Sequence, residues 1–434
     1  MSRVLPILVV ATTVFLPNAG RADVAACRSG QIDPRVQQVP AQIQQAALTQ
    51  PQQAIEPLVQ RLIRDAKDDF HKVKILHDWI AEHLVYDVES FLRGTTSDAT
   101  WENALLRRQA VCHGMSSLME KMCGIANIPC QVIPGYGRGY GFGLGRDENV
   151  REQNHAWNAV EIQGRWYLLD VTWDAGYVDG RTYQKRYSTA YLLLEPRQFL
   201  HTHFPTDARW QLLDPPMTPE AFAQLPYLEG RFFEQGLRLA TEVRRFHPVG
   251  ESVQFTVEAP AGVALIAQLA DPAAAGRKID HRVLVRRNGT TANVLVTFPR
   301  SGRWDVQILT KPRQSEGLYW RCGSLEFQSG GGSAWTFPKT FGTVGAMDAY
   351  LFVPLYVPLA AGTSQEFRIR VLGAEQVQLR IGEQQWVPMQ RAADDPEVYR
   401  VTTAVPAKTA VKIVARGRGE GNRYWTLVEW PATP

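Results

Sequence analysis

Apolar residues in the first part of the chain recur with the spacing of an α-helix. Between residues 32 and 86 they fall every three or four positions, which indicates helices that each bury one face. These positions are Ile55, Leu58, Leu62, Val73, Leu76, Ile80 and Leu84. A further helix is predicted to open at Cys112. Its apolar stripe consists of Met115, Leu118, Met119 and Met122.

The period changes to two after about residue 130, as it does in β-strands with one buried face. Residues 129–135 are predicted to form a strand, and residues 155–173 a hairpin that turns at Gln163-Gly164. If the turn has two residues, the numbers of paired residues sum to 327, as those of the two turn positions do. The register of the hairpin therefore follows from its turn.

A glycine-rich stretch, residues 135–153, separates these two segments. It does not match a nucleotide-binding fingerprint, because Tyr140 and Phe142 stand where the third glycine belongs, and no phosphate-binding lysine follows. Two interpretations stay open: a mobile loop beside His155, or a plain surface loop.

Beyond about residue 232 the chain is rich in short alternating runs and contains an internal repeat. The sequence GESVQF at residues 250–255 returns as GTSQEF at residues 362–367, and GLYW before the linker SGGGS has a counterpart in GNRYW after it. Two β-sandwich modules are predicted, residues 236–328 and 334–434, each of the usual size for such a domain. Neither holds a cluster of titratable residues, so these modules are expected to bind another protein or to position the remaining chain.

The overall composition excludes one class of partner. The chain of 434 residues suffices for two to four domains, and the formal net charge is only +4. No run of five or more Lys and Arg residues occurs. A basic patch of that kind is the usual footprint of nucleic-acid binding, so no nucleic-acid partner is expected.

The segment 1–22 has the layout of a secretory signal peptide: Arg3, an apolar run from Val4 to Pro17, and small residues up to Ala22. No other apolar run reaches spanning length, so no transmembrane segment is expected, and the protein is predicted to be secreted or periplasmic. The alternative is a lipid anchor at Cys27, because VAAC at residues 24–27 resembles a lipoprotein processing box. The charges of Arg21 and Asp23 argue against that anchor.

The five cysteines are an odd number, so at least one thiol is expected to be unpaired within the chain. If that thiol is Cys112, the pairs Cys123–Cys130 and Cys27–Cys322 are candidates for disulfides; the alternative is that Cys123 and Cys130 are buried thiols. A zinc site is not expected, because no familiar ligand spacing fits the nearby cysteines and His113. Neither a metal nor a cofactor is predicted.

Cys112 has the position of a nucleophile. The unpaired N–H groups at a helix N-terminus lower the pKa of a thiol, and a catalytic cysteine also needs a base and a group that orients the base. With the two-residue turn, His155 and Asp170 become diagonal neighbours on one sheet face, roughly 7–8 Å apart along the backbone. Asp174, an even number of residues beyond Asp170, would point to the same face of the sheet. Geometry alone leaves the choice between Asp170 and Asp174 open.

Two stretches resemble a known family. AVCHGMSSLMEKMCGIANIPCQVIPGYG and NHAWNAVEIQGRWYLLDVTWD are similar to the transglutaminase-like cysteine peptidase superfamily, and most of all to its kyphoscoliosis peptidase branch. The resemblance covers about residues 55–230, and the C-terminal half resembles the immunoglobulin-like modules of that branch. It implies an α+β fold: a papain-like, transglutaminase-like catalytic domain within residues 23–232, followed by the two β-sandwiches.

By that resemblance the catalytic triad is Cys112, His155 and Asp170, which decides against Asp174. The donor to the oxyanion stays open among the backbone N–H of Cys112 and the side chains of Trp101 and Gln109. The function this implies is that of an exported cysteine peptidase or amidase, which forms a thioester with protein or peptide substrates. Three alternatives stand beside it: a transglutaminase that passes the acyl group to an amine, a cell-wall amidase acting on envelope peptides, and a non-catalytic scaffold or adhesion protein.

Overall fold

The computed structural model describes residues 18–432 except 96–98, 141, 145, 146, 418 and 420. Most of the predicted signal peptide lies outside these residues. By their internal contacts the residues form two compact units, which are described separately: a first unit up to Val132 with Ala156–Leu194, and a second unit of Ile133–His155 with Glu195–Pro434. Among the described residues, no helix is both long and apolar enough to cross a membrane.

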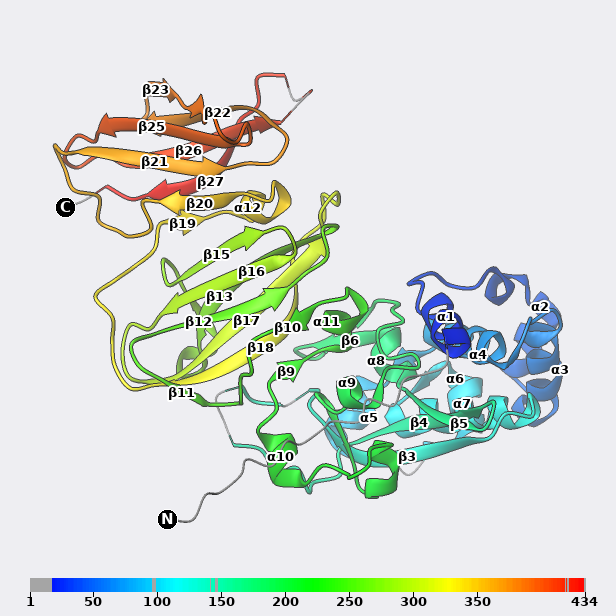
Figure 1. The fold of residues 1–434 in the computed structure, drawn as a ribbon. Helices are drawn as coiled ribbons and strands as arrows, with labels where there is room; N and C mark the ends of the chain where they lie inside the picture. The colour runs from blue at the N-terminus through cyan, green and yellow to red at the C-terminus, as the bar shows by residue number, and fades with distance from the viewer. Residues whose placement is uncertain are drawn as a thin grey trace, which may run out of the picture. The chain divides into compact units, whose positions relative to one another are not determined.

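The first unit is largely helical, as the apolar spacing predicts (Figure 1). Its helices are α1 (Asn18–Cys27), the 3-10 helix η1 (Pro34–Gln38), α2 (Ala41–Ala47), α3 (Pro51–Ile63), α4 (Asp69–His83), α5 (Val88–Arg93), α6 (Trp101–Arg107), α7 (Cys112–Ile125) and α8 (Val171–Ala175). All seven stripe positions of α3, α4 and the residue after it are buried and share one core with α7. Asp68 fixes the start of α4, since its carboxylate accepts the N–H of His71 at 2.8 Å.

Two small sheets accompany these helices. In the first unit β1 (Val85–Tyr86) and β2 (Gln109–Ala110) pair in parallel, with Tyr86 opposite Ala110. A four-stranded sheet has the order β5-β4-β3-β8. Its strands are β3 (Cys130–Gly137), β4 (His155–Ile162), β5 (Arg165–Leu169) and β8 (His203–Pro205).

The predicted hairpin is confirmed, and so is its register. Gln163 and Gly164 both have positive φ, 54° and 75°, as a two-residue turn of type I′ requires. Asn158 pairs with Leu169 and Ile162 with Arg165, which obeys the predicted sum. The strand ends at Leu169, however, and the chain turns into α8 before a short hairpin of β6 (Gly176–Asp179) and β7 (Thr182–Lys185).

The second unit contains short connecting helices and two β-sandwiches. The helices are α9 (Pro196–Phe199), η2 (Ala208–Gln211), α10 (Pro219–Ala223), α11 (Gly230–Glu234), η3 (Pro272–Ala274) and α12 (Gly342–Ala346). The first sandwich has one sheet in the order β10-β12-β16-β15 and another in the order β11-β18-β17-β13-β14, with β9 on β18. These strands are β9 (Tyr227–Leu228), β10 (Arg238–Leu239), β11 (His247–Val249), β12 (Ser252–Glu258), β13 (Val263–Asp271), β14 (Arg277–Ile279), β15 (Val283–Asn288), β16 (Thr291–Thr297), β17 (Gly302–Pro312) and β18 (Trp320–Ser329).

The second sandwich repeats this plan with the sheets β19-β27-β26-β22-β23 and β20-β21-β25-β24. Its strands are β19 (Lys339–Thr340), β20 (Tyr350–Val353), β21 (Ser364–Arg370), β22 (Ala374–Ile381), β23 (Gln385–Pro388), β24 (Gln390–Arg391), β25 (Val398–Ala404), β26 (Val411–Gly417) and β27 (Trp425–Trp430). The two halves of the sequence repeat form equivalent strands, since β12 and β21 both begin at the third residue of the first motif, while β18 and β27 begin at the tryptophan of the second. The predicted fold class is thus confirmed; the exact module boundaries stay a prediction.

A chain of buried charges holds the glycine-rich stretch in the second unit. Arg138 pairs with Glu148, whose Oε1 also accepts from Arg245 at 3.0 Å, and Arg245 in turn pairs with Glu326 in β18. All four side chains are at most 3% exposed. The two ends of this stretch are therefore anchored rather than free.

Candidate active site

Cys112 is the first residue of α7 and is partly exposed. The residue before it, Val111, is extended and offers no side-chain cap to the first N–H groups of the helix. The helix has 14 residues, and its dipole favours negative charge at this end. The predicted placement of Cys112 at a helix start is confirmed.

The hydroxyl of Tyr86 lies against Cys112. It is within hydrogen-bonding reach of the thiol and of the backbone N–H of Cys112, and it also feels the charge of Asp170. Burial, together with negative charge at Cys112 and Asp170, raises the pKa of Tyr86 far above its ordinary value. The hydroxyl therefore keeps its proton and can donate it to an anion at this position.

Replacing Tyr86 with phenylalanine is expected to raise the pKa of Cys112. A hydrogen bond to a charged group contributes about 1.5–3 kcal/mol, and since the site is partly exposed we expect a shift of about one unit. The measurement is the pH midpoint of Cys112 alkylation. Tyr183→Phe is the matched control, because it removes a hydroxyl that donates to the carbonyl of Ala175 instead. An unchanged midpoint in Tyr86→Phe would contradict the contact.

Two hydrogen bonds tie the helix of Cys112 to the strand that begins with His155. Ser116, one turn into α7, donates its hydroxyl to the carbonyl of Ala156 at 3.1 Å. Asn158 in β4 returns a bond from its side-chain amide to the carbonyl of Ser116 at 3.0 Å. Ser116 and Asn158 are both buried, so these bonds fix how the helix packs on the strand.

His155 is the first residue of β4, and its neighbour Asn154 fixes it to β3. The side chain of Asn154 accepts the N–H of Gly137 at 2.7 Å and donates to the carbonyl of the same residue at 3.2 Å. A Cβ at Gly137 would come within 3.0 Å of the Cβ of His155. The glycine thus leaves room for the His155 side chain, which would have to shift by a few tenths of an ångström if a Cβ stood there.

Asp170 is fully buried and caps α8. Its Oδ1 accepts the N–H groups of Thr172 at 2.8 Å and Trp173 at 3.2 Å, and its own N–H donates to the carbonyl of Tyr191 at 3.3 Å. The carboxylate thus has a fixed orientation, and its second oxygen, Oδ2, has no part in the cap.

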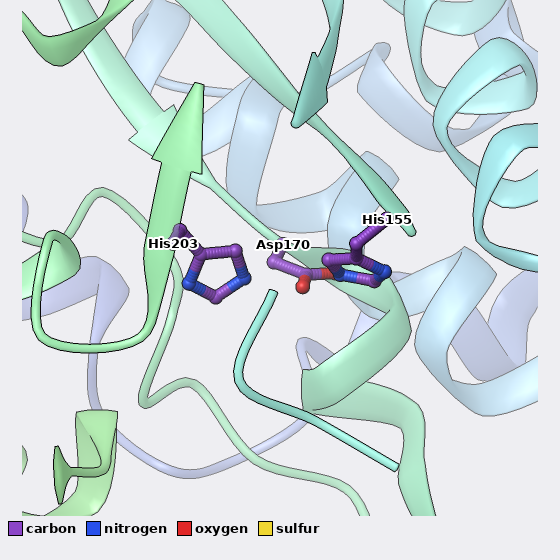
Figure 2. Close-up of side chains that lie close together, drawn as sticks. All are labelled: His155, Asp170 and His203. Atoms are coloured by element: carbon purple, nitrogen blue, oxygen red, sulfur yellow. The ribbon is translucent and has the colours of Figure 1, made fainter. Parts of the chain in front are cut away.

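The structure brings His155 and Asp170 together, and it adds a second histidine. One ligand atom each of His155, Asp170 and His203 lies within 4.8 Å of the others, and Figure 2 shows the carboxylate between the two imidazole rings. His203 begins β8 and is fully buried, with its ring centroid 4.1 Å from that of Phe199. Two imidazoles and a carboxylate are also ligand types that zinc accepts, so among the described residues this group is the one able to hold a metal ion.

Sequence reasoning missed His203 and Tyr86. Neither lies in the two stretches on which the family resemblance rests, and neither spacing nor periodicity distinguishes them from packing residues. Of the predicted oxyanion donors, the N–H of Cys112 faces the Tyr86 hydroxyl, Gln109 is exposed on β2, and Trp101 opens α6.

The remaining cysteines have a different environment from Cys112. No disulfide joins any of the five, all of which lie among the described residues, and Cys27, Cys123, Cys130 and Cys322 are buried. Burial raises the pKa of Cys27 and of Cys322 to about 12, while a hydrogen bond to Cys123 is the largest cause that raises the pKa of Cys130. The interpretation of Cys123 and Cys130 as buried neighbouring thiols matches this structure.

Comparison with known proteins agrees with this geometry. Residues 56–171 match the model of the transglutaminase-like superfamily, and residues 219–328 match the KY-like, immunoglobulin-like domain. The chain thus carries a transglutaminase-like domain followed by an immunoglobulin-like domain of the KY type, as the resemblance predicts. All three predicted triad residues fall within the first match.

Curated relatives place the resemblance in the kyphoscoliosis peptidase branch. The kyphoscoliosis peptidases of Mus musculus and Homo sapiens are 32% and 31% identical to this chain over 261 residues, which is 59% of this chain and 38% of each relative. This chain therefore aligns with less than two fifths of their length. A crystal structure of a TGase is 20% identical over 32% of this chain and 37% of its own, with a TM-score of 0.23.

Proposed function

We propose that this protein is a cysteine acyl-transfer enzyme that hydrolyses amide bonds in peptides or proteins. The observation that carries the proposal is that a ring nitrogen of His155 and a carboxylate oxygen of Asp170 lie within 4.8 Å of each other, at the start of the strand to which the helix of Cys112 is bonded. Its transglutaminase-like domain and the peptidase names of its relatives support the same chemistry.

The proposed reaction has two steps. His155 takes the thiol proton, and the sulfur of Cys112 attacks the amide carbonyl to form a tetrahedral oxyanion. The C–N bond then breaks, the imidazolium gives its proton to the leaving amine, and a thioester remains on Cys112. Water, deprotonated by His155, attacks the thioester and releases the acid and the free thiol.

Three further groups complete this mechanism. Asp170 keeps the imidazole oriented and stabilises its cation, as the third member of such a triad does. The proposed donors to the oxyanion are the N–H of Cys112 and the hydroxyl of Tyr86, which lie together at the start of α7. The signal-peptide pattern of residues 1–22 supports the further proposal that the enzyme acts outside the cytoplasm.

An activated ester tests this function without knowledge of the natural substrate. With a p-nitrophenyl ester, we expect a burst of about one nitrophenol per chain and an acyl adduct on Cys112 by peptide mass, a pattern typical of an acyl-enzyme. Cys112→Ala should show neither. Adduct decay in water supports a hydrolase, whereas decay that requires an added amine supports the transglutaminase. Absence of an adduct on Cys112 would contradict the proposal and favour a scaffold protein.

A further inference from the structure

A histidine cation lies buried beside the candidate site. His77 in α4, Asp78 and Asp174 are each 0% exposed. The Nδ1 of His77 lies 3.1 Å from a carboxylate oxygen of Asp78, and its Nε2 lies 3.1 Å from one of Asp174. Since both ring nitrogens face a carboxylate, we infer that each carries a hydrogen and that the ring is an imidazolium. Burial by itself would lower the pKa of His77, but the two hydrogen bonds outweigh it and the pKa is raised.

On one side of His77, several other groups form hydrogen bonds or ion pairs with the carboxylate of Asp78. The ammonium of Lys74 pairs with its Oδ2, the hydroxyl of Tyr187 donates to its Oδ1 at 2.6 Å, and the N–H of Asp33 donates to Oδ2 at 2.8 Å. Two buried cations thus face two buried carboxylates. The ring of Tyr187 also lies edge-on to the imidazole, with 6.3 Å between the ring centroids.

On the other side, Asp174 leads directly to Asp170. The N–H of Tyr191 donates to both oxygens of Asp174, at 3.2 and 3.1 Å, and the carbonyl of Tyr191 accepts the N–H of Asp170. The N–H of Asp174 donates in turn to the carbonyl of Asp170 at 3.2 Å. The backbone of Asp170 is therefore held by Tyr191, whose N–H is bound by the Asp174 carboxylate, and by the first backbone bond of α8.

Stability alone does not explain such an arrangement. A buried ion pair contributes little net stability compared with well-packed apolar side chains, whereas it does impose one geometry. Here the imposed geometry is that of the segment 170–174, which contains the triad aspartate.

We propose that His77 and Asp174 are positioning residues, which hold Asp170 at the distance and angle that its imidazole partner requires. Asp174 would act through Tyr191, and His77 would keep the Asp174 carboxylate charged and immobile. This inference rests on the proposed function, since it assigns a role only if Asp170 orients His155.

Two isosteric variants separate a positioning role from a merely structural one. Asp174→Asn leaves one acceptor oxygen for two donors, His77 and the Tyr191 N–H, and so disturbs the connection to Asp170. Asp78→Asn removes the other carboxylate partner of His77 but leaves Asp174 and Tyr191 in place. The measurement is the pH midpoint of Cys112 alkylation, recorded at a temperature where circular dichroism shows each variant folded.

In Asp174→Asn we expect the midpoint to rise by about one unit, and in Asp78→Asn by clearly less, because His77 keeps its contact with Asp174 there, even if both variants lose stability. An unshifted midpoint in Asp174→Asn, or an equal shift in both variants, would overturn the positioning role. His155→Ala is run in parallel: if the wild-type midpoint is ordinary and insensitive to this change, the proposed function fails and the inference falls with it.

A second measurement covers the case in which Asp174→Asn does not fold. Amide hydrogen exchange of the wild type then decides, because an N–H held by a buried carboxylate exchanges slowly. The N–H of Tyr191 is expected to be as protected as the amides of the central strand β4. Exchange at the rate of the exposed loops would overturn the inference.

Discussion

Replacing His155 with alanine is expected to slow the alkylation of Cys112 about 100-fold at pH 6.5. A thiol with an ordinary pKa of about 8.5 is only about 1% thiolate at that pH, whereas a cysteine paired with an imidazolium is largely ionised. Since only the thiolate reacts, the rate reports the ion pair directly. The helix N-terminus remains in the variant and retains part of the effect, so 100-fold is the upper end of the expected loss at this pH. The loss becomes smaller as the pH rises and disappears above about pH 9.

The matched control for this prediction is His247→Ala. His247 begins β11 in the first sandwich and is partly exposed, so its removal changes the charge of the protein without touching the site. Its alkylation profile should equal that of the wild type. If His155→Ala also keeps the wild-type profile, Cys112 and His155 do not form a catalytic pair.

Glu148→Gln is expected to destabilise the second unit by about 3–5 kcal/mol, the usual loss when one member of a buried charge network is removed. Glu148 is 3% exposed and serves two arginines, Arg138 and Arg245, which would then compete for one amide oxygen. The measurement is the shift of the urea unfolding transition. Since the chain has several domains, the transition of the second unit is followed separately by site-resolved hydrogen exchange.

The neighbouring residue supplies the control. Asp147 pairs with Arg303 at 3.2 Å, but their side chains are 83% and 38% exposed. Because water and salt screen such a pair, Asp147→Asn is expected to cost less than about 1 kcal/mol. Equal, small losses in both variants would show that the buried network does not anchor the glycine-rich stretch.

The hairpin shows which structural features can be predicted from residues that are close together in the sequence. Its register could be predicted because a two-residue turn at Gln163-Gly164 fixes every pair behind it. The helix start at Cys112 could be predicted for the same kind of reason, since the apolar stripe of α7 begins there. Both features depend on residues that are close in sequence.

The choice between Asp170 and Asp174 depends on contacts that local pattern does not contain. Parity along a strand allowed both residues, because it assumed that β5 continues past Leu169. The chain instead forms α8, in which Asp170 caps the helix and Asp174 turns to His77, a residue 97 positions earlier. Such long-range pairs, like the approach of His203 to His155, arise only when the helices and the sheet pack.

Whether Cys112 is a nucleophile is decided by site-resolved alkylation of the native protein at pH 6.5 with a limiting amount of iodoacetamide. The other four cysteines are internal references, because all are buried and burial raises the pKa of at least Cys27 and Cys322 to about 12. We predict that Cys112 alone is labelled, and that labelling is complete before any other cysteine reacts. If Cys112 reacts no faster than the buried thiols, or only near its ordinary pKa of about 8.5, it is not a nucleophile.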